Sequence, residues 1–366
     1  MQPTPFCNID CSYCYLPNRS SKKRLSFDLA ETVFRKLFSF PTIREAVTLV
    51  WHAGEPLVLP TSYYERMFVL IQNLAPRDLQ IRHSFQTNGT LISETWCELI
   101  KAWQINVGVS IDGPKEFHNR YRKGRNGAGS FDRAFAGLQK LQRAGIPCHV
   151  ISVLTLESLR QPDRLFDFYV DNAIDDVCFN IEEQEGTNAQ SKFVGNSSAN
   201  SLYWSFLRRF VELTIERKKD IFIREIESSL HAIRGHGSLI RNEQAEPFRI
   251  ISVDCDGNIS TFSPELLGLR HELYGSFSFG NLVHDSFEDI SARVLDSRLY
   301  ADIRAGIREC SSVCAYYGVC GGGAPSNKIY ENGSAASTET AYCRAFMSAI
   351  DIVLDLTERL PPELTA

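Results

Sequence analysis

The chain has 366 residues, with 44 Asp and Glu against 39 Lys and Arg, and its formal net charge is -5 at pH 7. This length allows two or three domains around a large core, and the charge balance argues against nucleic-acid binding. No apolar run approaches the ~18 residues that span a bilayer, so we expect a cytoplasmic protein. Eleven cysteines in a reducing compartment indicate metal binding or catalysis before disulfides.

Three cysteines stand close together near the start of the chain. Cys7, Cys11 and Cys14 supply three thiolates from one short loop. Iron-sulfur clusters are normally held by four cysteines, so the trio predicts a 4Fe-4S cluster with one iron left for another ligand. A structural zinc site is the alternative, although such sites usually bring two pairs of ligands. The spacing alone leaves both open.

Short β-rich runs alternate with amphipathic stretches in the first half of the chain. The expected strands are 46–52, 80–87, 105–112, 148–155 and 176–182. The expected helices are 27–39, 62–74, 93–103, 131–144 and 161–172. Repeated βα units predict an α/β fold with a parallel sheet. Only six residues precede Cys7, so we expect any strand before it to be very short or missing.

The run 105–112 is the clearest of these strands. Its aliphatic residues alternate with small and polar ones, so Ser110 and Asp112 share the other face at the carboxyl end. Ligands bind at that end in barrels of parallel strands. Loop capping is the alternative explanation for Ser and Asp there.

The sequence changes character after residue 183 and again near residue 250. Polar, turn-rich stretches come first, and two amphipathic runs follow at 203–218 and 223–234. We therefore expect a barrel domain, a linker with bridging helices, and a further domain, at 1–183, 184–249 and 250–366. The last of these holds a second cysteine group: Cys310, Cys314, Cys320 and Cys343. Four thiolates in this order can close a full 4Fe-4S cluster.

Two motifs in the first half carry a family resemblance. The cysteine trio and Gly54-Glu55-Pro56, about forty residues later, resemble the radical S-adenosylmethionine (SAM) enzymes, with Ala53 in place of the family's first glycine. The resemblance implies a partial (β/α)6 barrel in which the amino and carboxylate groups of SAM bind the open iron. It implies SAM contacts by Tyr13, Gly54, Glu55, Ser110, Asp112 and Arg122.

Each contact implied by the resemblance suits the chemistry of its side chain. Glu55 would complement the SAM ammonium, Ser110 would contact SAM, and Asp112 would hydrogen-bond the ribose hydroxyls. The forked guanidinium of Arg122 would engage the SAM carboxylate. Tyr13 stands where the family places an aromatic residue near the adenine, and an ordinary loop aromatic is an equal alternative.

The second cysteine group and the glycines at 321–323 resemble the SPASM extension of peptide-modifying radical SAM enzymes. That extension usually carries two auxiliary clusters. Ala324 and Phe262 stand where the family has two ligands of the first of them, so we expect a single auxiliary 4Fe-4S cluster. Its ligands would be Cys310, Cys314, Cys320 and Cys343. Cys255 is expected to be a free thiol.

The strings 261–268, 314–327 and 337–340 are similar to maturases that crosslink ribosomal precursor peptides with glycine-rich repeats. The resemblance implies formation of a three-residue cyclophane, in which a side-chain Cβ bonds to an aromatic ring carbon. It also implies an external one-electron reductant of the flavodoxin or ferredoxin type. The reaction needs a base, and Glu265 is our candidate.

Three other functions stay open. Thioether or formylglycine formation would use the same parts, although Ser263 stands where sulfatase maturases place an aspartate base. A non-enzymatic iron-sulfur protein would not need the motifs at Glu55 and Ser110. A zinc-stabilised binding module would be colourless and indifferent to oxygen. The sequence does not identify the precursor peptide or the place where its leader binds.

Overall fold

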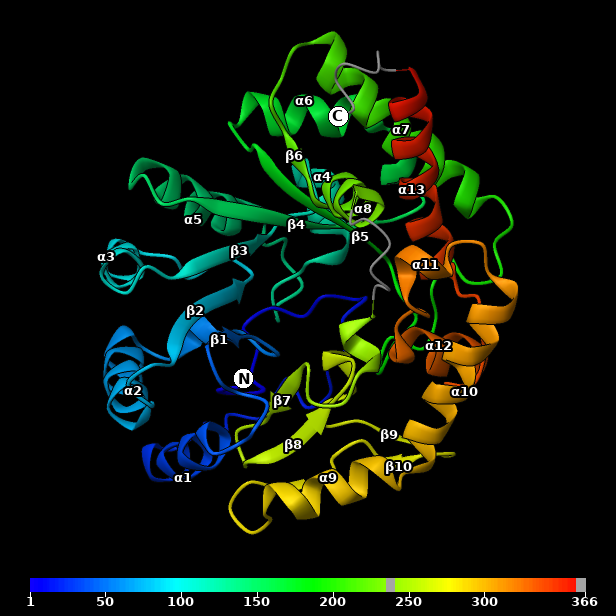
Figure 1. The fold of residues 1–366 in the computed structure, drawn as a ribbon. Helices are drawn as coiled ribbons and strands as arrows, with labels where there is room; N and C mark the ends of the chain where they lie inside the picture. Colours follow the sequence, from blue (N-terminus) through cyan, green and yellow to red (C-terminus); the bar gives the residue numbers. More distant parts are fainter. Residues whose placement is uncertain (235–240, 360–366) are drawn as a thin grey trace.

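A parallel sheet organises the first half of the molecule. The computed structural model describes residues 1–234 and 241–359, and the six strands of the sheet stand in chain order with every neighbouring pair parallel (Figure 1). They are β1 (Ala46–Trp51), β2 (Gln80–Thr87), β3 (Asn106–Ser110), β4 (Cys148–Leu154), β5 (Asp176–Ile181) and β6 (Phe222–Ile223). The α/β fold and the five expected strands are confirmed. The short β6 was not predicted.

Helices cover the outer face of the sheet. Ser26 and Ser93 begin two of them by accepting hydrogen bonds from the backbone N–H groups of Leu29 and Trp96. The bounds are α1 (Phe27–Phe38), α2 (Thr61–Leu74), α3 (Glu94–Ala102), α4 (Lys115–Tyr121), α5 (Phe131–Arg143) and α6 (Pro162–Asp171). Helices α1, α2, α3, α5 and α6 bury apolar faces against the strands, as Phe34 does on Trp51 and Tyr169 on Phe179, whereas α4 packs against α5. The five expected helices are confirmed, and α4 is an addition.

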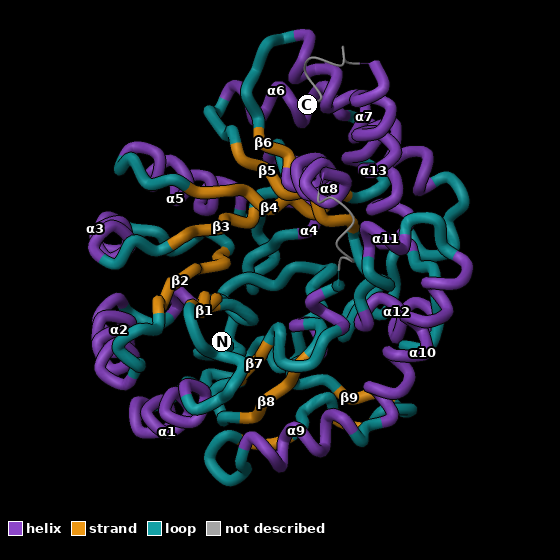
Figure 2. Tube along the Cα trace, in the orientation of Figure 1, coloured by secondary structure: helices purple, strands orange, loops and turns teal. Residues whose placement is uncertain are grey.

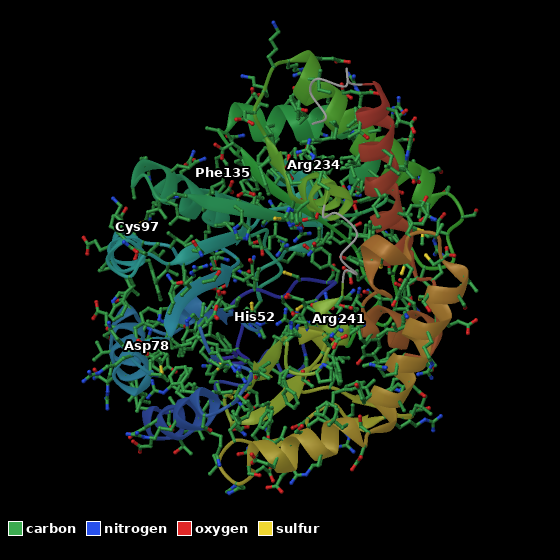
Figure 3. The ribbon with its side chains drawn as sticks, viewed as in Figure 1. His52, Asp78, Cys97, Phe135, Arg234 and Arg241 are labelled. Carbon is green, nitrogen blue, oxygen red and sulfur yellow. The ribbon has the colours of Figure 1, made fainter. Side chains whose placement is uncertain are left out.

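Aromatic rings fill the space between β1, β2 and the helices α2 and α3. The ring centroid of Tyr64 lies 4.8 Å from that of Phe85 and 5.6 Å from that of Trp96. Burying a ring of this size stabilises the fold by about 1.5–3 kcal/mol. Figure 3 shows Cys97 on the outer helix α3, whereas His52 lies at the inner end of β1. The turn that begins at His52 therefore extends from a firmly packed strand.

The C-terminal helix returns to the sheet. Helix α13 (Ala341–Arg359) packs against α7 (Ala199–Glu216) and α8 (Arg224–Arg234), beyond β5 and β6 (Figure 1). The two helices expected after the linker are confirmed as α7 and α8. This packing brings Cys343, in the first turn of α13, to the end of the molecule where the strands finish.

Short strands, short helices and long loops form the remainder (Figure 2). An antiparallel sheet has the order β11 (Gly280–Asn281), β8 (Asn258–Thr261), β7 (Ile251–Val253), and β9 (Arg270–His271) pairs with β10 (Gly275–Ser276). The helices are α9 (Phe287–Leu295), α10 (Arg298–Val313), α11 (Tyr317–Cys320) and α12 (Pro325–Asn332). Single 3-10 turns occur at Pro56–Val58, Ser158–Arg160, Glu243–Ala245 and Pro264–Leu266.

The N-terminal segment joins the two sheets without forming a strand. The backbone N–H of His52, after β1, donates to the Met1 carbonyl at 3.1 Å, and that of Gln2 donates to Val253 in β7 at 2.8 Å. As expected, no strand precedes Cys7; the parallel sheet reaches six strands through β6. The chain then runs from between the sheets into the cysteine loop.

None of the eleven cysteines, which all lie in the described residues, forms a disulfide. Within the described ranges, no helix combines the length and hydropathy that a bilayer span requires.

Gly137 of α5 provides a test of how closely that helix approaches the sheet. A Cβ at this position would lie 2.1 Å from the carbonyl oxygen of Gly89, in the turn after β2. Helix propensity alone favours Ala over Gly by about 1 kcal/mol. We expect Gly137→Ala instead to lower the free energy of unfolding by about 1–3 kcal/mol, measured by urea denaturation. The exposed Gln139→Ala should change it by less than about 0.5 kcal/mol, and a stabilised Gly137→Ala protein would contradict the packing.

Candidate active site

The first three cysteines lie in a loop that the segment after α4 holds by its backbone. Ser12 N–H donates to the Tyr121 carbonyl at 3.0 Å, and Asp10 N–H donates to that of Lys123 at 2.6 Å. The side chain of Arg125 completes the attachment, because its Nε donates to the Cys7 carbonyl at 2.7 Å. Residues far apart in sequence thus fix the shape of the loop.

Of the three cysteines in this loop, Cys11 is buried and Cys7 and Cys14 are partly buried. Burial raises the pKa of Cys7 to about 12 and that of Cys11 to about 11, and the Cys14 thiolate adds to both shifts. A metal ion reverses such shifts, because it takes the place of the proton on each thiol. Asn88 adds a donor, with its Nδ2 3.8 Å from Cys7 Sγ. Cys7 and Cys11 thus favour the protonated thiol unless a metal group takes the place of the proton.

A buried network ties the same loop to the end of β3. Asp112 Oδ2 accepts a hydrogen bond from Tyr13 and another from Arg122 Nε at 3.0 Å, while Oδ1 accepts from Val153 N–H at 2.9 Å. The side chains of Asp112 and Arg122 are only 4% and 8% exposed. The guanidinium also lies over the Tyr13 ring, 5.4 Å from its centroid. Three residues that the family resemblance assigned to SAM thus contact one another.

The turn after β1 uses backbone conformations that side chains disfavour. Ala53 has φ +65° and Gly54 has φ +131°. A Cβ on Gly54 would lie 2.3 Å from the Thr4 carbonyl oxygen. The backbone of the N-terminal segment can therefore pack this closely only against glycine. The left-handed conformation of Ala53 costs about 1 kcal/mol that the glycine of the family motif would avoid.

Glu55 is fully engaged with its surroundings. One carboxylate oxygen accepts from Thr87 Oγ1 at 2.6 Å and Leu57 N–H at 3.0 Å, and the other accepts from Asn88 N–H at 2.8 Å. Burial raises its pKa to about 7. The side chain joins the ends of β1 and β2, and this role was not foreseen from the motif.

Ser110 belongs to a polar row on the inner face of the sheet. Gln86 Nε2 donates to Ser110 Oγ at 3.2 Å. Gly108, in β3, pairs with Gln86 of β2 and with His149 of β4. A Cβ on Gly108 would lie 2.2 Å from Gln86 Oε1 and 2.5 Å from His149 Nε2, so glycine makes room for both side chains. Burial lowers the pKa of His149. Ser110 thus lies next to Gln86 near the carboxyl ends of β3 and β2.

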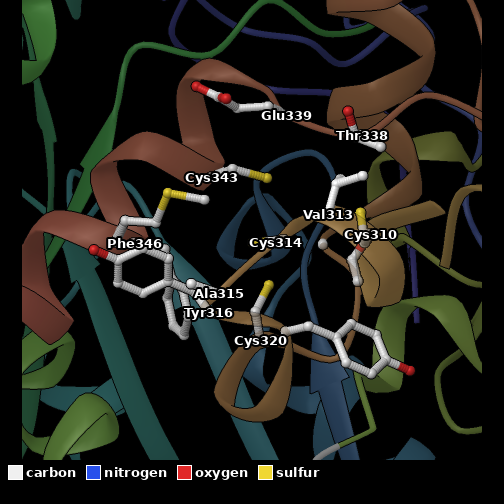
Figure 4. Close-up of a pocket in the computed structure, with 14 residues that line it drawn as sticks. Cys310, Val313, Cys314, Ala315, Tyr316, Cys320, Thr338, Glu339, Cys343 and Phe346 are labelled. Carbon is white, nitrogen blue, oxygen red and sulfur yellow. The ribbon is translucent and has the colours of Figure 1, made fainter. Parts of the chain in front are cut away.

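Four cysteines surround a cavity at the other side of the molecule. They line a cavity of about 250 Å³, and Glu339 and Thr338 also lie at its wall (Figure 4). They come from the end of α10, the loop after it, α11 and the first turn of α13: Cys310, Cys314, Cys320 and Cys343. The fold thus brings together four cysteines that are spread over residues 310–343.

Apolar packing occupies one of the two positions where the family resemblance lacks a cysteine. Phe262 is fully buried, with its ring stacked at 6.2 Å on Tyr300 and edge-on at 6.1 Å to Phe279. Ala324 is 3% exposed and precedes α12. Ser263 Oγ accepts from Ser326 N–H at 3.2 Å, so this serine anchors α12.

Three carboxylates gather between the two cysteine groups. Asn327 Nδ2 donates to Glu183 at 2.7 Å and to Glu185 at 3.3 Å. Glu265, our candidate base, lies beside them, and its Oε2 is buried with no hydrogen-bond partner in the described structure. Burial and the neighbouring carboxylates raise the pKa of Glu183 to about 7. The sequence did not predict this cluster, because its members come from distant segments.

Tyr15 links the carboxylates to the first cysteine loop. Burial raises its pKa well above the usual range, and the charges of Glu265 and Cys14 add to the shift. Thr187 Oγ1 donates to the Cys14 carbonyl at 2.9 Å. The acidic cluster therefore stands next to the loop that holds the first cysteine group.

Comparisons with known proteins agree with this geometry. The family model described as the radical SAM superfamily matches residues 1–169. The chain belongs to the radical SAM superfamily. It is 43% identical over 349 residues to the uncharacterised Synechocystis protein sll1766, across 94% of this chain and 87% of that protein. The family match and the enzymes among its relatives, described next, make this chain a radical SAM enzyme.

More distant relatives of this radical SAM enzyme have named activities. A serine-type anaerobic sulfatase-maturating enzyme of Bacteroides thetaiotaomicron is 25% identical over 382 residues, across 98% of this chain and 89% of that enzyme. The structure of anSMEcpe with bound AdoMet and Kp18Cys peptide superposes with a TM-score of 0.78 over 98% of both chains. Streptococcus suis SuiB with S-adenosylmethionine gives 0.63, over 93% of this chain and 76% of SuiB. Both are 18% identical, so they show a shared fold.

The residues present fit the group that the superfamily implies, a 4Fe-4S cluster with SAM. Each thiolate of a 4Fe-4S cluster binds a different iron. The cysteine sulfurs that hold a cluster therefore stand around it and do not converge on one point. In residues 1–234 and 241–359, no three His, Cys, Asp or Glu side chains converge as ligands of one metal ion. The trio Cys7, Cys11 and Cys14, with the charge of Arg122 near Cys11, supplies suitable donors.

The buried pair of Asp112 and Arg122 predicts a large effect on stability. We expect Asp112→Asn to lower the free energy of unfolding by about 3–5 kcal/mol, because it leaves the Arg122 charge buried without its partner. Urea denaturation of the metal-free protein measures the change. The exposed pair Lys115 and Asp132, 2.7 Å apart, is the control: Lys115→Met should cost less than about 1 kcal/mol. Equal effects of the two variants would contradict the role of the network.

The carboxylate cluster predicts a pH dependence of stability. Burial and the neighbouring carboxylates raise the pKa of the native Glu183 carboxyl to about 7, above the value of 4.5 that it has in the unfolded chain. Stability should therefore fall as pH rises from about 4.5 to 7, by about 3 kcal/mol for this group. Glu183→Gln should flatten the slope in urea denaturation, and the exposed Glu272→Gln should leave it unchanged. A wild-type slope in Glu183→Gln would refute the assignment.

Proposed function

We propose that this radical SAM enzyme oxidatively crosslinks a ribosomally made precursor peptide, joining an aromatic ring carbon to a side-chain Cβ in a three-residue cyclophane. The observation that carries the proposal is the free carboxylate oxygen of Glu265, buried between the two cysteine groups. The likeness of 261–268, 314–327 and 337–340 to crosslinking maturases supports it. Relatives named as sulfatase-maturating enzymes support a peptide or protein substrate.

The crosslink removes two hydrogens from the peptide. A hydrogen atom leaves Cβ, the carbon radical bonds to the ring, and the ring then loses one proton and one electron. When bound, SAM with its cluster supplies the 5'-deoxyadenosyl radical that takes the hydrogen atom, and an auxiliary cluster supplies an electron acceptor. Glu265 takes the proton, since a base must reach it directly or through one water.

The SAM contacts remain part of the proposal. We propose that Ser110, whose Oγ accepts a hydrogen bond from Gln86, and the backbone at Gly54 contact SAM. Asp112 and Arg122 pair with each other next to Tyr13, and we propose that this pair borders the SAM site. Glu55 supports the turn through its three hydrogen bonds.

The second cysteine group is proposed to hold one auxiliary 4Fe-4S cluster. The four proposed ligands line one cavity (Figure 4). Phe262, which stands where the family has a ligand of a further cluster, is packed against Tyr300. A cytoplasmic flavodoxin or ferredoxin is the proposed reductant. We propose the barrel at 1–183, the bridging region at 184–249 and the auxiliary domain at 250–366.

A different maturation reaction is the second candidate, since relatives carry the name of anaerobic sulfatase-maturating enzymes. Formylglycine or thioether formation likewise removes two hydrogens. The hydrogen bond from Ser326 N–H to Ser263 gives Ser263 a structural role, and a serine is a poor base beside the free carboxylate of Glu265. We therefore favour crosslinking.

Co-expression with a glycine-rich precursor peptide that carries an aromatic residue tests the proposal. We expect a mass loss of two hydrogens per crosslinked motif, and fragmentation that stops between the joined residues. A peptide of unchanged mass, or an aldehyde trapped by a hydrazide on a sulfatase, would refute crosslinking. Iron analysis should give about eight irons per chain for two clusters, and about twelve would refute the single auxiliary cluster.

Variants separate the radical step from the later proton transfer. Cys14→Ala should abolish 5'-deoxyadenosine formation and the crosslink together. Glu265→Gln should keep 5'-deoxyadenosine formation and lower crosslinking by about 100-fold or more, the usual effect of losing a general base. The exposed Glu272→Gln is its control. Full crosslinking by Glu265→Gln would exclude Glu265 as the base.

A further inference from the structure

A lysine lies inside the second cysteine group. Lys328, in α12, is 2% exposed, and its Nζ is 3.4 Å from Cys310 Sγ. Lysine is almost never buried unless its charge is paired. Packing alone therefore does not explain why the Lys328 ammonium is buried.

Two glycines make the room that Lys328 occupies. A Cβ on Gly306, in α10, would lie 3.1 Å from Lys328 Nζ. A Cβ on Gly323 would lie 3.6 Å from Lys328 Cε and 3.3 Å from Cys343 Sγ. The lysine thus passes between the helix that carries Cys310 and the glycine turn beside Cys343, and it reaches two of the four cysteines.

Lys328 has no carboxylate to balance it. Among residues 1–234 and 241–359, no Asp or Glu lies within ion-pair distance of its ammonium. A buried ammonium without an anion is costly. The nearest anionic group that the site can form is the thiolate set itself, because a 4Fe-4S cluster held by four thiolates carries net negative charge.

We propose that Lys328 is the charge partner of the auxiliary cluster and raises its reduction potential; this rests on the proposed function. Reduction adds a negative charge to the cluster, and a fixed positive charge within contact distance of one ligand stabilises the reduced state more than the oxidised one. Charge and hydrogen bonds near the sulfurs set such potentials. Lys328 thereby makes the second cysteine group a better acceptor for the electron that leaves the peptide.

The test is an EPR-monitored redox titration of the full-length chain. Cys7, Cys11 and Cys14 are replaced by Ala so that only the auxiliary cluster is present, and Lys328→Met, Lys328→Arg and the parent are compared. We expect Lys328→Met to lower the ratio of reduced to oxidised cluster at a given potential by about tenfold or more, which is 59 mV for one electron. Lys328→Arg keeps the charge and should stay near the parent. Lys140→Met, on α5, is the control for loss of a distant lysine, and it should match the parent.

The outcomes separate the existence of the auxiliary cluster from the role of Lys328. No iron in the parent would overturn the auxiliary cluster, and Lys328 with it. About four irons with equal potentials in Lys328→Met and the parent would overturn the role of Lys328 alone. Loss of the cluster in Lys328→Met but not in Lys328→Arg would support the charge pairing, whereas its loss in both would overturn it.

Discussion

Asp112 and Arg122 form an ion pair that water hardly reaches, and Tyr13 donates to the same carboxylate oxygen. One partner stands at the end of β3, another follows α4, and the third lies in the first cysteine loop. The loop has no regular secondary structure of its own, so its shape depends on such contacts. A buried charge tolerates few alternative positions, because each move away from its partner exposes an unpaired ion. The network therefore fixes the cysteines relative to the strand ends.

The second half of the molecule is joined to this arrangement through α12. Ser326 Oγ donates to Glu185, Asn327 donates to Glu183, and Lys328 reaches Cys310. Ser326, Asn327 and Lys328 are all almost fully buried. One helical turn thus contacts the carboxylates beside the first cysteine loop and the thiols of the second cysteine group.

The sequence predicted the strands and helices of the sheet well, because each has a local period and local start signals. Ser110 and Asp112 could be placed at a strand end for the same reason. The carboxylate cluster could not be predicted, since Glu183 and Glu265 meet only through the packing of distant loops. Two-residue β6 is too short to show a period. The left-handed φ of Ala53 also has no local signature, and only the family's glycine hinted at it.

The contacts of α12 have a geometric consequence. Consecutive residues of a helix are separated by a rise of 1.5 Å and about a quarter of a turn, so Asn327 and Lys328 point to different sides of one rigid element. Thermal motion that displaces α12 shifts both side chains in step. The carboxylate that Asn327 contacts and the thiol that Lys328 contacts are therefore held at a spacing that the helix sets.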